Sequence, residues 1–130
     1  MALKTFEDIT EALTDVERET IVPILLDTLK FSNDKNAFKG KTLVGHLRAC
    51  GYHYMSEPRL RKLTHYIRVR NLAAPNALIA TSKGYFMSGD VNVIEDQIES
   101  LIGRIESMKQ AVEALRSQLA ILSGIFSSFT

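Results

Sequence analysis

The predicted fold rests mainly on residues 56–87, which read SEPRLRKLTHYIRVRNLAAPNALIATSKGYFM. Ser56 is a favourable N-cap, and Pro58 is tolerated in the first turn of a helix, so a helix is expected to begin here. Apolar residues follow at helical spacing and predict a buried stripe made of Leu60, Leu63 and Ile67. Asn71 is expected to end this helix.

A β-hairpin is predicted after this helix. Residues 77–81 (ALIAT) and 85–87 (YFM) are mostly apolar or aromatic and suit strands, and a Ser-Lys-Gly turn at residues 82–84 lies between them. Because the turn is short, the two strands are expected to pair antiparallel, with Lys83 at the tip of the hairpin.

A helix with an interruption is predicted near the N-terminus. Thr14 and Glu17 form a capping-box pattern, in which each side chain binds the backbone N–H of the other residue. Apolar residues at roughly helical spacing follow as far as Leu29. Pro23 lies inside this pattern and has no N–H to donate, so it is expected to kink or divide the helix.

Another helix is expected between this segment and residue 56. It is predicted to begin at Lys41 or Thr42 and to run to Cys50, with Leu43, Leu47 and Cys50 on its buried face. The glycine that follows Cys50 supplies the C-cap.

The order of these elements predicts the fold. Only residues 51–55 separate the second helix from the third, and a connection this short is typical of a helix-turn-helix. Three helices followed by a hairpin are the order of a winged helix. The predicted class is therefore mainly α (α+β), with a winged helix-turn-helix domain and its β-hairpin wing over residues 1–89.

Residues 90–130 are expected to form a long coiled-coil helix, capped by Asp90, that associates with other copies of the chain. Apolar residues recur there at alternating steps of four and three, and this average spacing of 3.5 favours a narrow seam that supercoils against another helix. The predicted seam consists of Ile94, Ile98, Leu101, Ile105, Met108, Val112, Leu115, Leu119, Leu122 and Phe126.

The seam favours a dimer and leaves its orientation open. β-Branched residues at one core position and mostly leucine at the other favour a parallel pair. However, a parallel pair sets Arg104 against Lys109 of the other copy, whereas an antiparallel pair can set Glu95 near Arg116. Additional isoleucines widen the apolar stripe, so a trimer or tetramer remains an alternative.

The charge of the chain is concentrated in one segment. The formal net charge is only +1, but residues 35–70 contain one acid, Glu57, against nine basic residues: Lys35, Lys39, Lys41, Arg48, Arg59, Arg61, Lys62, Arg68 and Arg70. Such a patch suits a polyanion, because contact with phosphates releases condensed counterions.

We therefore expect the third helix to contact DNA, together with the start of the second helix and the hairpin tip. The candidate DNA-binding residues are Lys41, Thr42, Ser56, Arg59, Arg61, Lys62, His65, Arg68, Lys83 and Tyr85. The competing interpretation is a solvated basic surface whose arginines pair with acids elsewhere in the chain. Arg59 and Tyr66 lie at the edge of the buried stripe, so packing against the core is an alternative for both.

Three stretches of the chain carry a resemblance to a known group: Leu13-Thr14-Asp15 with Pro23, Arg59-Leu60-Arg61-Lys62-Leu63 with Tyr66-Ile67-Arg68, and Ile79-Ala80-Thr81-Ser82-Lys83-Gly84-Tyr85-Phe86-Met87. They resemble small phage and prophage winged-helix proteins, whose wing is likewise followed by a C-terminal heptad helix. The resemblance implies the fold and a phage origin, and it implies DNA binding only by analogy.

Other classes of function are not expected. No spacing activates a nucleophile or pairs carboxylates in an apolar setting, so no enzyme, catalytic residue or cofactor is predicted. His46, Cys50 and His53 lack a fourth ligand, so no metal site is predicted. The single cysteine and the absence of a signal-peptide or membrane-spanning pattern favour a cytoplasmic protein with no membrane partner.

The leading hypothesis is a dimeric or higher-oligomer DNA-binding protein, a regulator or replication accessory factor of a phage or mobile element. The first alternative is a non-enzymatic interaction module, in which the winged helix binds a host or phage protein. A structural oligomer without a ligand is the second, but it leaves the one-sided basic helix unexplained.

Overall fold

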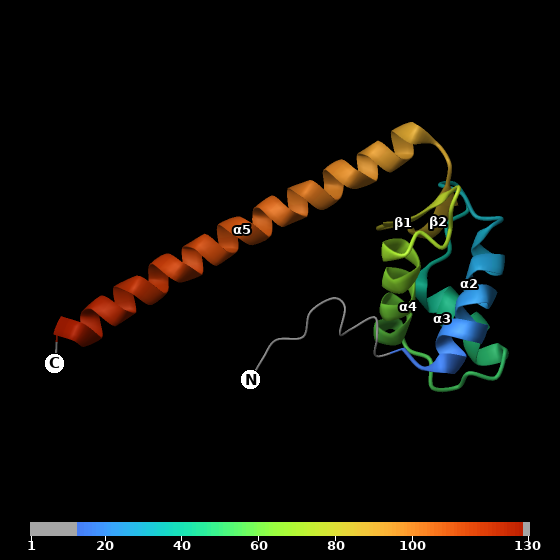
Figure 1. Cartoon of the computed structure of the whole chain (residues 1–130), viewed down its shortest axis with the longest axis horizontal. Helices are drawn as coiled ribbons and strands as arrows, with labels where there is room; N and C mark the ends of the chain where they lie inside the picture. The colour runs from blue at the N-terminus through green and yellow to red at the C-terminus, as the bar shows by residue number, and fades with distance from the viewer. Residues whose placement is uncertain (1–12, 129–130) are drawn as a thin grey trace. The chain divides into compact units, whose positions relative to one another are not determined.

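The computed structural model describes the backbone of residues 13–128 and the side chains of residues 13–124. It divides into two compact units between Ile94 and Glu95, and each unit is described by itself. The elements of the first unit are η1 (Glu17–Ile21), α2 (Val22–Leu29), α3 (Gly40–Ala49), α4 (Glu57–Val69), β1 (Ala77–Thr81) and β2 (Gly84–Ser88). Helix α5 (Val91–Ser128) begins at the end of the first unit, and its residues from Glu95 onward form the described part of the second unit (Figure 1).

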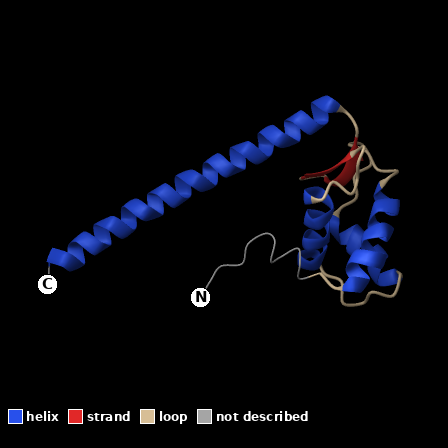
Figure 2. Cartoon of the chain, in the orientation of Figure 1, coloured by secondary structure: helices blue, strands red, loops and turns tan. Residues whose placement is uncertain are grey.

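The described chain is mainly helical with one antiparallel hairpin and a long C-terminal helix, as predicted (Figure 2). In the first unit, α4 packs against α3 and β1, and α2 packs against β2. The predicted stripe of α4 is buried, and side chains of α2 and α3 complete the centre of the core. The fully buried residues of these three helices are Leu25, Leu29, Leu43, Leu47, Leu60, Leu63 and Ile67.

The predicted capping box is present at the start of the first helical segment. The backbone N–H of Thr14 donates to Oε1 of Glu17 at 2.8 Å, and the backbone N–H of Glu17 donates to Oγ1 of Thr14 at 3.1 Å. The predicted effect of Pro23 takes the form of a π-helical segment, η1, that precedes α2. A wider turn fits here because proline cannot donate the usual backbone hydrogen bond to the preceding turn.

Helix α3 begins slightly earlier than predicted, at Gly40, and ends as predicted before Gly51. Gly51 has a φ of +106°, a conformation that suits glycine and ends the helix. The prediction of a buried Cys50 is wrong, because Cys50 is the C-cap residue and is exposed. Val44 takes its place in the buried face beside Leu43 and Leu47. The helical spacing fails for Cys50 because the helix ends there.

The hairpin is held to the domain by a third backbone segment. Tyr85 in β2 exchanges two hydrogen bonds with Phe38, from N–H to C=O in both directions, each 2.8 Å long. Gly84 lies at this crossing with a φ of +125°, and a Cβ atom there would lie 2.4 Å from the carbonyl oxygen of Phe38. Only glycine therefore fits where the hairpin crosses the segment between α2 and α3.

Helix α5 starts as predicted at Asp90, whose Oδ1 accepts the N–H of Asn92 at 2.8 Å. The predicted seam residues lie on its surface. Ile94 and Leu101 are half-buried, and the exposed members are Ile98, Ile105, Met108, Val112, Leu115, Leu119 and Leu122. Phe126 belongs to the same helix, but its side chain lies outside the described residues.

Candidate nucleic-acid interface

Helix α4 carries four of the candidate DNA-binding residues on the side away from its buried stripe. Arg61 is exposed, whereas Lys62, His65 and Arg68 are half-buried. The sequence predicts all four on the exposed side, so the structure reduces the accessible part of this surface. The predicted cap is present, because Oγ of Ser56 accepts the backbone N–H of Arg59 at 3.3 Å. The side chain of Ser56 therefore has a structural role at the start of α4.

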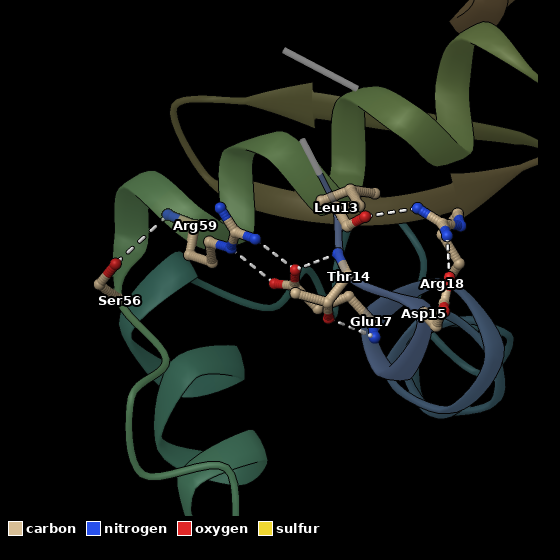
Figure 3. Close-up of polar contacts among 7 residues, drawn as sticks. All are labelled: Leu13, Thr14, Asp15, Glu17, Arg18, Ser56 and Arg59. Atoms are coloured by element: carbon tan, nitrogen blue, oxygen red, sulfur yellow. Dashed lines mark hydrogen bonds and ion pairs between the residues drawn. The ribbon is translucent and has the colours of Figure 1, made fainter. Parts of the chain in front are cut away.

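The structure gives Arg59 a different role from the predicted DNA contact. Its guanidinium forms a salt bridge with the fully buried carboxylate of Glu17, and Arg59 Nε lies 2.6 Å from Glu17 Oε2 (Figure 3). The second guanidinium contact is to Oε1, the oxygen that also accepts the N–H of Thr14. Arg59 therefore joins the first helical segment to α4, and this contact competes with its predicted contact to DNA.

Each member of this ion pair shifts the pKa of the other in the direction that favours the charged form. Burial alone raises the pKa of Glu17, but the hydrogen bonds from Arg59 and from the Thr14 amide, with the positive charge of Arg59, outweigh it and lower the pKa. The hydrogen bond to Glu17 is the main reason that the pKa of Arg59 is raised. The exposed Tyr54 lies beside the pair, and burial together with the Glu17 charge raises its pKa. Both members of the pair are therefore charged at neutral pH.

Two further cations of the basic segment have partners within the domain. Nε of Arg48 donates to the carbonyl oxygen of Met55 at 2.9 Å, across the connection between α3 and α4. The guanidinium of Arg70 lies 4.8 Å from the ring centroid of Tyr66, in a cation–π contact. Tyr66 itself is half-buried against the core, which is the alternative that its position at the edge of the stripe suggests.

His65 adds little positive charge to the surface of α4. Burial lowers the pKa of its imidazole, and the nearby positive charge of Arg68 lowers that pKa further. Since the ordinary pKa of histidine is already 6.5, the ring is neutral at pH 7. A neutral imidazole can bind a phosphate only by hydrogen bonding, so any ionic contact from this surface comes from Arg61, Lys62 and Arg68.

A shallow groove joins the start of α3 to the hairpin. It is lined by Lys39, Gly40, Lys41, Glu57, Ala80, Thr81, Ser82, Gly84 and Tyr85. Lys41 and Thr42 are exposed in the first turn of α3, where the N-cap residue Lys39 makes no side-chain capping hydrogen bond. Two predicted site residues that are far apart in the sequence, Lys41 and Tyr85, therefore meet in one groove.

Lys83 is exposed at the predicted hairpin tip, and its backbone N–H donates to Oγ1 of Thr81 at 3.1 Å. A second shallow groove lies between α3 and the start of α4, and Lys41 also lines it, with Val44, Gly45, Arg48, Ser56, Glu57 and Pro58. The outer residues of α4, from Arg61 onward, do not line either groove. The predicted site is thus divided between two grooves and the outer side of α4.

Two charged residues of the first groove, Lys39 and Glu57, are absent from the predicted site. Lys39 is exposed beside Lys41, and Glu57 places Oε1 3.2 Å from the position that a Cβ on Gly40 would occupy. Glu57 therefore brings negative charge to the N-terminus of α3, where a phosphate would otherwise be favoured. The sequence contains a signal for both residues, because each lies at the boundary of a predicted helix in the basic segment.

In the part of the chain that the structure describes, no group of three or more His, Cys, Asp and Glu residues is placed to hold a metal ion. No helix within residues 13–128 is long and apolar enough to cross a membrane. Comparisons with models of protein families, with curated proteins and with solved structures found no match for this chain. The resemblance to small phage winged-helix proteins therefore stays a prediction from the sequence.

Proposed function

We propose that this chain is an oligomeric, non-enzymatic DNA-binding protein with a winged-helix domain. The order α2, α3, α4 and hairpin supports the winged-helix assignment, and so does the backbone bridge between Phe38 and Tyr85, which joins the hairpin to the segment before α3. In this fold the helix that follows the short turn, here α4, approaches the DNA, and the hairpin lies beside it.

The observation that carries the proposal is a set of exposed cations without acidic partners. Within residues 13–124, the salt bridges are Arg18–Asp15, Lys30–Asp27 and Arg59–Glu17. Lys39, Lys41, Arg61 and Lys83 are exposed and belong to none of these pairs. Arg59 pairs with an acid elsewhere in the chain, as the competing interpretation expects, but these four residues do not. Unpaired surface cations of one sign attract a phosphate backbone.

A biological role on DNA requires more than phosphate contacts. Phosphate contacts position a protein on DNA, whereas base contacts specify the sequence that it binds. The exposed Arg61 is the α4 residue best suited to a base contact, since arginine binds guanine through two hydrogen bonds. With the resemblance to phage winged-helix proteins, this favours a cytoplasmic regulator or replication accessory factor of a phage or mobile element.

The test is a fluorescence-anisotropy titration of the full chain against a random-sequence duplex at several salt concentrations. A protein that neutralises about five phosphates loses roughly 10²- to 10³-fold in affinity between about 50 and 200 mM salt. Arg61→Glu with Arg68→Glu, or Lys41→Glu with Lys83→Glu, should abolish binding and leave the circular dichroism spectrum unchanged. If the wild-type protein does not bind at low salt, the DNA-binding proposal is wrong.

Lys30→Glu is the matched control for these charge reversals. Lys30 lies at the end of α2, and its Nζ is 2.6 Å from Oδ1 of Asp27. The substitution makes the same change of charge as each single reversal, away from the two grooves and from α4. It should therefore change the affinity for DNA less than twofold, an effect of about 0.4 kcal/mol.

One observation favours the second candidate, a module that binds a host or phage protein. Val69 and Leu72, at the end of α4, are 55% and 41% exposed. Apolar side chains of this kind are typical of the centre of a protein interface and add little to phosphate binding. Val69→Ser removes the apolar side chain without adding charge and should leave DNA affinity nearly unchanged if α4 binds phosphates. A loss of partner binding without a loss of DNA binding would therefore favour this candidate.

A further inference from the structure

The apolar seam of helix α5 is exposed to solvent in the single chain. Met108, Leu115 and Leu119 are 67%, 70% and 65% exposed, and the neighbouring seam residues are exposed as well. An apolar stripe of this length on a soluble chain needs a partner surface. The same seam on a second copy of the chain is a suitable partner surface, because two seams with the same spacing of three and four residues can pack along their whole length.

The seam permits two orientations, and the residues that flank it distinguish them. In a parallel pair, the flanking position of one helix meets the position five residues later on the other helix. Arg104 of each copy then lies against Lys109 of the other, so a parallel dimer contains this repulsive pair twice. No pair of opposite charges at the flanking positions compensates for it, because Glu95 then has no basic residue opposite.

The antiparallel orientation removes the repulsion. With Ile105 of one copy opposite Met108 of the other, every seam residue from Ile94 to Leu119 meets a seam residue of the second copy. The layers on either side of the centre are Leu101 with Val112, Ile98 with Leu115, and Ile94 with Leu119. The same register keeps the two cations Arg104 and Lys109 on different sides of the pair.

This register also gives partners to the flanking residues. Glu95 of each copy lies opposite Arg116 of the other, so the dimer contains two pairs of opposite charge. Ile102, which is 58% exposed and lies beside the seam, is placed next to the aliphatic stem of Lys109. In the single chain, Glu95, Arg104, Lys109 and Arg116 are all exposed and available for these contacts.

We infer that α5 pairs with α5 of a second copy in the antiparallel orientation, with Ile105 opposite Met108. This inference rests on the oligomeric part of the proposed function, and it adds the orientation and the register. Each N-terminal unit is joined to the start of its own α5. The two basic units therefore attach to opposite ends of a rod about 45 to 50 Å long, at 1.5 Å per residue.

Disulfide trapping tests the orientation without involving DNA. In a Cys50→Ser background, which removes the exposed native thiol, one chain carries Ile98→Cys and a second, distinguished by a mass tag, carries Leu115→Cys. The antiparallel register predicts rapid cross-links between the two different variants and few cross-links between two copies of the same variant. Gln110→Cys, on the outer side of α5, is the control and should not cross-link in either orientation.

Charge reversal tests the register independently. Glu95→Arg should weaken the dimer on the order of tenfold, because two attractive pairs become repulsive, and adding Arg116→Glu should restore it. Glu106→Arg makes the same change on the outer side of the helix and should have little effect. Lys109→Glu should not strengthen the dimer, whereas it would do so in a parallel pair by attracting Arg104.

Each outcome can be separated from the proposed function. Cross-links of each cysteine only with itself, or a tighter dimer with Lys109→Glu, overturn the antiparallel inference and leave an oligomeric DNA-binding protein possible. A wild-type chain that sediments as a monomer at tens of micromolar overturns the oligomer and this inference together. Loss of DNA binding in the anisotropy assay, with the mixed cross-links intact, overturns only the proposed function.

Discussion

The leucine side chains of the two units differ in what covers them. In the first unit, Leu25, Leu47 and Leu63 are 0% exposed, because α2, α3, α4 and the hairpin surround them. In α5, Leu115 and Leu119 are 70% and 65% exposed. Burial of a leucine contributes about 2 kcal/mol, so the first unit has its hydrophobic stabilisation within one chain. The exposed leucines of α5 would gain this stabilisation from the proposed partner copy.

The two units are therefore expected to respond differently to substitution. A single substitution in the first unit acts on a core that one chain provides, so its effect does not depend on protein concentration. In the proposed oligomer, a substitution in α5 acts on an association equilibrium, so its effect depends on concentration. An isolated helix is marginal in water, and α5 is therefore expected to lose helix when the partner is lost.

The largest expected effect comes from charging the seam. Leu101→Asp with Leu115→Asp places carboxylates in the contact between copies, and burial of unpaired charge costs several kcal/mol. The dissociation constant should rise by at least about 10³-fold, so that sedimentation reports a monomer. Far-ultraviolet circular dichroism should show a loss of helix that comes from α5 alone.

The matched control for the charged seam is Gln110→Asp with Ser117→Asp on the opposite side of α5. This variant adds the same two charges and should remain an oligomer. A monomer in both variants would mean that added charge, rather than its place in the seam, causes the dissociation.

The next largest effect concerns the ion pair of the first unit. Glu17→Ala leaves the guanidinium of Arg59 without its carboxylate and removes half of the capping box, so the free energy of unfolding should fall by about 3 kcal/mol. Glu17→Gln keeps the capping-box hydrogen bond and should lose less. Urea denaturation of both variants measures the difference. Equal stability of Glu17→Ala and wild type would show that Arg59 does not depend on this contact.

A glycine in each unit is expected to respond differently to substitution by alanine. Gly84→Ala should lower the free energy of unfolding of the first unit by about 2 kcal/mol or more, because φ is +125° and the new Cβ would lie 2.4 Å from the Phe38 carbonyl oxygen. Thermal unfolding with a probe in the first unit measures this. An unchanged midpoint would mean that the bridge between Phe38 and Tyr85 adjusts without cost.

Gly103→Ala is expected to have the opposite sign. Nothing lies within 4 Å of the position that its Cβ would take, and alanine favours a helix by about 1 kcal/mol over glycine. The change should stabilise α5 and, by linkage, tighten the oligomer about fivefold or more. A weaker oligomer would place Gly103 inside the contact between copies and would contradict the assigned seam.

The smallest expected effect is the pH dependence of the first unit. The pKa of Glu17 is below its ordinary value of 4.5 in the folded chain, so the unfolded chain binds this proton more readily. The stabilisation is therefore complete above about pH 4.5 and is lost as the pH falls through the lowered pKa. Urea midpoints of wild type and Glu17→Gln should converge over this range, and a gap that persists in acid would contradict the assignment.

Much of the fold can be predicted because its signals are local. The Thr14–Glu17 capping box, the Ser56 cap, the Gly51 helix end and the β1 strand depend on residues a few positions apart in the sequence, and each is present in the structure. The candidate site is less predictable. Charge composition locates a basic segment, but it does not tell which cations have internal partners.

Arg59 and Cys50 are two residues whose surroundings differ from those that the sequence predicts. Arg59 lies among other cations in the sequence, and its acid is 42 residues away in another helix. Cys50 follows the spacing of the buried face of α3, but the helix ends at that residue and leaves the thiol exposed. The partner of Arg59 has no local signal, because it depends on how separate elements meet. The exposure of Cys50 follows from the end of the helix, which Gly51 marks in the sequence.

The amino-acid sequence alone determined the order of the elements, the caps and turns, and the heptad spacing of α5, because these depend on contacts between near neighbours along the chain. The tertiary structure decided three further features: the buried partner of Arg59, the backbone bridge that makes Gly84 necessary, and the meeting of Lys41 with Tyr85 in one groove. Their physical reason is the packing of the helices around one core, which brings together residues that no periodicity in the sequence relates.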